Sequence, residues 1–177
     1  MTQNPPIIDV AVDGQTPKAQ NPTAPYEDAA IGGHALASME AGAAMVHNHT
    51  EEPVFGGTGK FDGEAYARPW RRALEARPDA ILVPTMPVGQ EGVPVEVRYS
   101  HITAMANEGL IAQGLCDPGS FNLSLVDTDG LFAPTDMIYR NDMSDSRYYV
   151  ETCRELNLGL SVSIFEPGFL KFMMAYV

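Results

Sequence analysis

The sequence predicts an α/β fold with a parallel sheet, because strand-like and helix-like stretches alternate along it. Short apolar runs typical of buried strands alternate five times with longer stretches typical of helices. Polar or glycine residues follow each of these runs, and functional residues of (β/α)8 barrels gather at the carboxyl ends of the strands. No G-x-G-x-x-G follows the first run, which argues against a dinucleotide-binding fold. These observations favour a single domain of the (β/α)8 TIM-barrel type over residues 1–177.

The first half of the chain contains three of the expected strands, each rich in apolar and β-branched residues. They are expected at residues 7–12, 43–49 and 80–85. Helices are expected between them, at residues 26–41 and 63–77. Gly42 is the expected stop of the first helix, and Pro69 is expected to kink the second.

The second half of the chain continues the alternation. Strands are expected at residues 110–116 and 160–165, and helices at residues 97–108 and 145–156. A hinge-like segment is expected at residues 127–144, and a last apolar stretch at residues 169–177. Glu166 and the Pro-Gly pair after it form the expected turn into that stretch.

The number of expected strands is too small for a closed barrel, which takes eight strands and typically about 250 residues. The sequence of 177 residues also stops inside an apolar stretch, with no polar exit after it. Such an end would leave a strand edge and apolar surface uncovered. We therefore expect an incomplete barrel of about five βα units whose C-terminal part is missing, and we expect this piece to associate with copies of itself.

The charge and the cysteine content exclude several classes of protein. The formal net charge is -12, from 23 acidic and 11 basic residues, whereas nucleic acids and anionic membrane surfaces bind clustered Lys and Arg. The two cysteines, Cys116 and Cys153, lie far apart, so no disulfide framework is indicated and a reducing cytoplasm is expected. No apolar signal segment and no run of about 18 apolar residues is present.

Two histidines at the end of the second expected strand predict part of a metal site. Side chains alternate along a strand, so His47 and His49 project from one face, and Asn48 projects from the other. At ~3.3 Å per residue their Cα atoms are ~6.6 Å apart. Two imidazoles at that separation can converge on one divalent ion with bonds of ~2.0–2.1 Å. A pair of hydrogen-bonded core or loop histidines is the alternative interpretation of the same triplet.

Four stretches of the chain together resemble one family, the β-keto acid cleavage enzymes of the 3-keto-5-aminohexanoate type. These stretches are Asp13–Pro22, Ala41–His49, Arg77–Ile81 and Asp117–Asn122. The resemblance implies a TIM barrel that holds one Zn²⁺ ion per subunit. It also implies a retro-Claisen-type acyl transfer, in which a β-keto acid and acetyl-CoA become acetoacetate and a new acyl-CoA. We expect a cytoplasmic homo-oligomer, and the net negative charge argues against binding to nucleic acid or to a membrane.

The resemblance also implies roles for individual residues. His47 and His49 match the two histidine ligands of the family. Thr85 matches a Ser or Thr that helps to hold the substrate carboxylate, although a simple strand-end cap explains it equally well. The polar loop after the fourth strand is implied to line the substrate pocket, through Gly119, Ser120 and Asn122.

The chain departs from the family pattern in ways that bear on catalysis. Gln15 stands where the family usually has a glutamate, and an amide can orient a substrate but cannot act as a base. Ser161 and Ser163 stand where family members carry acids. The third zinc ligand, a glutamate near a late strand, would lie beyond residue 177, so the chain alone is expected to be inactive. Glu166 is a weaker candidate for that ligand.

Two other functions remain open on the sequence alone. The chain could be a non-catalytic fragment of the same fold that binds a metal or a small acid, which Gln15 favours. It could also be an unrelated metal-dependent hydrolase on a TIM barrel. That group usually carries its His-x-His pair after the first strand rather than the second, so this alternative ranks last.

Overall fold

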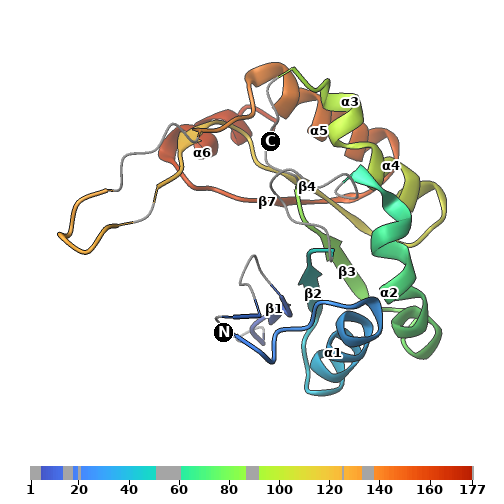
Figure 1. The fold of residues 1–177 in the computed structure, drawn as a ribbon. Coiled ribbons are helices and arrows are strands. Elements are labelled where there is room, and N and C mark those ends of the chain that lie inside the picture. Colours follow the sequence, from blue (N-terminus) through green and yellow to red (C-terminus); the bar gives the residue numbers. More distant parts are fainter. Residues whose placement is uncertain are drawn as a thin grey trace.

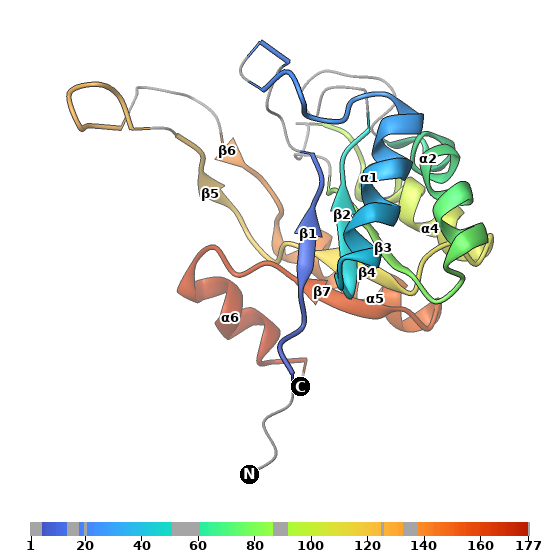
Figure 2. The same cartoon turned by 90° about the horizontal axis from the view of Figure 1, so that it is seen from below.

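The fold is built on a row of five short parallel strands. The computed structural model describes residues 5–13, 18–19, 21–50, 61–86, 92–124, 126–132 and 138–176. The five strands are β1 (Asp9–Ala11), β2 (Met45–Asn48), β3 (Ile81–Pro84), β4 (Gln113–Cys116) and β7 (Gly159–Val162). Strands β1, β2 and β3 form one parallel sheet, β4 pairs in parallel with β7, and β3 lies beside β4 (Figure 2). All five predicted strands are therefore present, in the predicted order.

Helices connect these strands and cover one side of the row. They are α1 (Asp28–Glu40), α2 (Gly63–Ala76), α3 (Val95–Arg98), α4 (Ser100–Asn107), α5 (Met143–Glu155) and α6 (Pro167–Met173). Helices α1, α2, α4 and α5 lie on the same side of the strands, whereas α6 lies beyond β7 (Figures 1 and 2). The helix predicted at residues 97–108 is divided at Tyr99 into α3 and α4. The Tyr99 side chain is fully buried, and its hydroxyl donates a hydrogen bond to the Leu115 carbonyl at 2.8 Å.

The hydrophobic core lies between the strands and these helices, and aromatic residues make up much of it. Trp70, Tyr66, Tyr99 and Tyr149 are fully buried there. Gly32 lets α1 approach α2 closely, because a Cβ atom at this position would overlap the carbonyl oxygen of Pro69. Helix α2 continues through Pro69 to Ala76, so the proline does not end it. Gly42 follows the end of α1 with a φ of 108°, as expected of a glycine stop.

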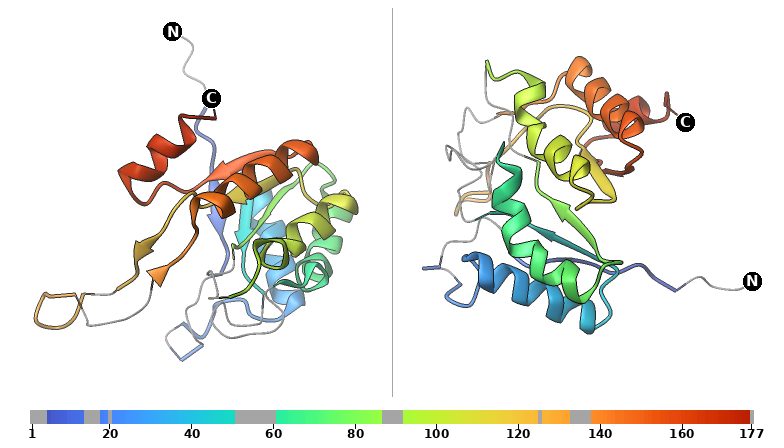
Figure 3. Two further views of the ribbon diagram at one scale, coloured as in Figure 1. Left: turned by 90° about the horizontal axis from the view of Figure 1, so that it is seen from above. Right: turned by 90° about the vertical axis from the view of Figure 1, so that its right-hand side faces the viewer.

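One predicted segment was wrong. The hinge-like segment expected at residues 127–144 contains strand β6 (Ile138–Tyr139) and the first residues of α5. Strand β6 pairs antiparallel with β5 (Phe121–Asn122), and the two form an arm that projects from the body (Figure 3). The rings of Phe121 and Tyr139 lie 5.3 Å apart across this hairpin. Helix α5 begins early because the Asp142 side chain accepts hydrogen bonds from two amides of its first turn.

The strands do not close into a barrel within the part of the chain that the structure describes. The two cysteines, Cys116 and Cys153, are both buried and free. Among the helices of the described ranges, none combines the length and the apolar character needed to cross a bilayer.

Candidate active site

Parallel pairing brings the residues that follow neighbouring strands to one edge of the sheet. Ala11 pairs with His47, and His47 pairs with Val83. Two residues further along, Asp13, His49 and Thr85 therefore come together beyond the strand ends. Asp117 follows β4 at the same edge and interacts electrostatically with His47. This edge is where the sequence predicted a functional site.

The two histidines occupy the positions predicted from the alternation of side chains along β2. His47 and His49 are half-buried, and their ring centroids lie 5.2 Å apart in an edge-to-face arrangement. Asn48 is fully buried, and its Oδ1 accepts a hydrogen bond from Nε1 of Trp70 on α2 at 2.6 Å. The opposite orientation of Asn48 confirms the predicted alternation. Because Asn48 points to the other face of β2, the imidazoles of His47 and His49 share one face of the strand.

Burial keeps both imidazoles in the neutral form that binds metal ions. It lowers the pKa of His47, although the Asp9 carboxylate acts in the opposite direction. Burial and the neighbouring His47 ring lower the pKa of His49 to about 4. The Nδ1 atom of His49 is buried and has no hydrogen-bond partner among the described residues. Two neutral imidazoles, one of them with an unsatisfied ring nitrogen, fit two of the three protein ligands of a zinc site.

A third ligand is not found among the described residues, where no group of three or more His, Cys, Asp or Glu side chains is placed to hold a metal ion. Glu166, the weaker candidate for this ligand, is exposed as the N-cap residue of α6. It makes no side-chain hydrogen bond in that cap. The histidine pair is therefore one part of the site that the sequence predicts.

Two buried carboxylates lie beside the histidines, and neither was predicted from the sequence to have a role in the site. The Asp13 carboxylate accepts a hydrogen bond from the backbone N–H of His49 at 2.7 Å, and burial raises its pKa to about 6. The Asp117 carboxylate accepts a hydrogen bond from the Tyr139 hydroxyl. Burial raises the pKa of Asp117 as well. Both residues directly follow predicted strands, and the parallel register between neighbouring strands is the signal that would have found them.

The predicted substrate residues have different environments. Thr85 is buried after β3, and its carbonyl accepts a hydrogen bond from Nε2 of His101 at 3.1 Å. Gly119 faces Phe169 of α6 so closely that a Cβ atom would overlap the ring, which explains the glycine by packing alone. Asn122 is exposed on β5. Gln15 lies outside the described residues.

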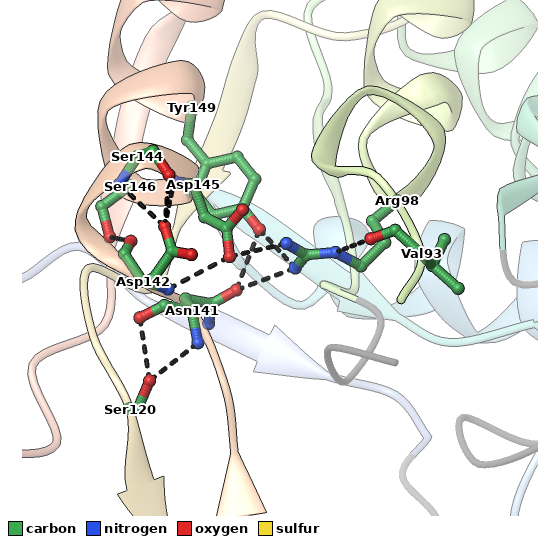
Figure 4. Close-up of polar contacts among 9 residues, drawn as sticks. All are labelled: Val93, Arg98, Ser120, Asn141, Asp142, Ser144, Asp145, Ser146 and Tyr149. Carbon is green, nitrogen blue, oxygen red and sulfur yellow. Dashed lines mark hydrogen bonds and ion pairs between the residues drawn. The ribbon is translucent and has the colours of Figure 1, made fainter. Parts of the chain in front are cut away.

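Ser120 connects the predicted substrate loop to a buried polar network around Arg98 (Figure 4). Its Oγ donates to the Asn141 carbonyl at 2.9 Å and accepts from the Asn141 N–H at 3.0 Å. The Asn141 side-chain oxygen accepts hydrogen bonds from Arg98 and from the Tyr149 hydroxyl. Arg98 also pairs with Asp145 on α5 at 2.6 Å. The network therefore fixes the loop after β4 to α3 and α5.

We expect the Ser120→Ala substitution to lower the free energy of unfolding by about 1–2 kcal/mol, because two hydrogen bonds to the Asn141 backbone are lost. Urea unfolding followed by circular dichroism measures the change. Ser38→Ala on α1 is the matched control and should change stability by less than about 0.5 kcal/mol. Equal stabilities for Ser120→Ala and the control would show that the Ser120 hydroxyl does not hold the loop.

Comparison with known proteins places the chain in a family. The family model described as beta-keto acid cleavage enzyme matches residues 5–177, nearly the whole sequence. A search of curated proteins found no match. The family consists of enzymes that act on β-keto acids, and the match confirms the resemblance carried by the strand-end motifs. The chain therefore belongs to the beta-keto acid cleavage enzyme family.

Proposed function

We propose that this chain forms the N-terminal part of a zinc-dependent acyltransferase that acts on a β-keto acid and acetyl-CoA. The products would be acetoacetate and a new acyl-CoA. The single observation that carries the proposal is the His47–His49 pair, two neutral imidazoles 5.2 Å apart at the carboxyl edge of the sheet. The family match to enzymes acting on β-keto acids supports the same reaction class.

The proposed chemistry distributes several tasks among the residues at this edge. When bound, a zinc ion supplies Lewis acidity toward the oxygen atoms of a β-keto acid. His47 and His49 would hold the ion, and the Thr85 hydroxyl would bind the substrate carboxylate. Gln15 would orient the substrate through its amide. The loop that carries Gly119, Ser120 and Asn122 would line the pocket.

The five βα units would be part of a (β/α)8 barrel, and a further segment of the protein would complete it. The parallel order of β1, β2, β3, β4 and β7, with helices along one side, supports this arrangement. The third zinc ligand would come from polypeptide outside the described residues. A site with only the two histidines would bind zinc weakly, and this chain alone would be inactive. Exposed strand edges would favour a homo-oligomer. The two free cysteines would suit a reducing cytoplasm.

Metal analysis tests the proposal directly. The protein, completed with its C-terminal segment, is loaded with zinc, freed of excess metal and assayed for zinc per chain by mass spectrometry. We expect the His47→Ala, His49→Ala double substitution to weaken zinc binding by about 100-fold or more, because both imidazole ligands are lost. His34→Ala is the matched control, because His34 is exposed on α1. Unchanged zinc content in the double variant would contradict the proposal.

A non-catalytic role in binding a metal or a small acid is the second candidate. Gln15 favours it, because an amide cannot abstract a proton. The two functions differ in one measurement, the formation of acetoacetate from β-keto acids and acetyl-CoA by the zinc-loaded protein completed with its C-terminal segment. Zinc binding without any acetoacetate would favour the non-catalytic role.

A further inference from the structure

Asp13 takes the place of a backbone carbonyl in the pairing between β1 and β2. The two strands are parallel, with Ala11 opposite His47, and the Val12 N–H donates to the His47 carbonyl at 3.1 Å. Beyond this point the His49 N–H donates to the Asp13 carboxylate at 2.7 Å rather than to a main-chain oxygen. The Asp13 side chain is thereby held directly beside the His49 residue.

The same carboxylate oxygen faces the ring of His49. Oδ1 of Asp13 lies 3.7 Å from Nδ1 of His49, and the two side chains are only 6% and 16% exposed. Nδ1 of His49 is buried without a hydrogen-bond partner in the described part of the chain. A buried carboxylate and an unsatisfied imidazole nitrogen therefore face each other, and a small rotation of the ring would join them in a hydrogen bond.

We propose that Asp13 is a positioning residue for the metal ligand His49, an inference that rests on the proposed zinc function. The carboxylate accepts the Nδ1–H of His49, which fixes the neutral tautomer whose Nε2 lone pair is free. A carboxylate behind a histidine ligand also makes the ring a stronger donor toward a metal ion, and its loss typically costs 10–100-fold in metal affinity. The backbone hydrogen bond from His49 prevents the carboxylate from turning away.

The tautomer of His49 is the readout that a merely structural role would not change. In ¹⁵N-labelled, metal-free protein, long-range ¹H–¹⁵N spectra report which ring nitrogen carries the proton, and His49→Ala assigns the signals. We expect Nδ1–H in the wild-type protein and a mixture of both tautomers in Asp13→Ala. An unchanged tautomer in Asp13→Ala, or Nε2–H in the wild type, would overturn the proposal.

Zinc affinity, measured by competition with a chelating dye, is the second readout. Asp13→Ala should bind zinc about 10–100-fold more weakly than the wild type. Asp13→Asn keeps the shape and should lose less, and it replaces Asp13→Ala if that variant does not fold. Asp79→Asn is the control, because Asp79 is exposed.

Equal zinc affinities for Asp13→Asn, Asp13→Ala and the wild type would also overturn the proposal. If the wild type binds no zinc, the proposed function fails, whereas the tautomer of the metal-free protein still decides the role of Asp13.

Discussion

Asp145→Asn is expected to destabilise the protein by about 3–5 kcal/mol, the usual cost of leaving a buried charge without its partner. The Arg98 side chain is 5% exposed and that of Asp145 14%, and they are joined by an ion pair of 2.6 Å. The remaining contacts of the Arg98 guanidinium in Figure 4 are to neutral groups, namely Val93, Asn141 and Tyr149. The substitution therefore removes the carboxylate that pairs directly with this cation.

The helix cap does not account for the expected loss. Asp145 accepts a hydrogen bond from the Asp142 N–H at 3.1 Å as part of a capping box. An asparagine oxygen can accept the same bond, so Asp145→Asn isolates the loss of charge. Urea unfolding measures the effect. Glu151→Gln is the control, because its pairing with Arg147 is exposed and should be worth less than about 0.5 kcal/mol.

A double variant separates the charge from the packing. Arg98→Met combined with Asp145→Leu removes both charges and fills a similar volume, and such replacements of buried pairs are often neutral or stabilising. We expect it to be more stable than Asp145→Asn. A loss below about 1 kcal/mol in Asp145→Asn would show that water reaches the Arg98 guanidinium.

The sequence predicted the features of this protein that depend on local periodicity. A strand has a side-chain period of two, so a short apolar run was enough to place His47 and His49 on one face and Asn48 on the other. The same periodicity placed the five strands to within a few residues. Polar residues after each strand then indicated the edge at which the site lies, because parallel strands end together.

Features that depend on pairing between distant segments were not predictable in the same way. Asp13 acquires its role from the register of β1 against β2, which places it beside His49, 36 positions later in the chain. The β5–β6 hairpin depends on ring contacts between Phe121 and Tyr139, with a long connection between them. Arginine is a residue type usually found at the surface, and Arg98 is buried by contacts with residues distant in the sequence, among them Asp145 and Tyr149 of α5.

Asn48→Ala is expected to lower the free energy of unfolding by about 2–5 kcal/mol, because two buried polar groups lose their partners. The Asn48 side chain accepts from Nε1 of Trp70 and donates from Nδ2 to the His49 carbonyl, each at 2.6 Å. Both Asn48 and Trp70 are fully buried, so water cannot replace the bond between their side chains. Asn107→Ala is the control at an exposed position on α4 and should change stability by less than about 0.5 kcal/mol.

A double-mutant cycle with Trp70→Phe tests whether the bond between the two side chains carries the effect. If it does, the double variant loses less than the sum of the single losses, with a coupling of roughly 1–2 kcal/mol. Additive losses would assign the effect to packing alone.

Because Asn48 also holds the carbonyl of His49, Asn48→Ala should weaken zinc binding in the folded protein, whereas Trp70→Phe should weaken it less. The asparagine between the two histidines would then anchor the end of β2 from its buried face, so that the opposite face can present both imidazoles to one ion.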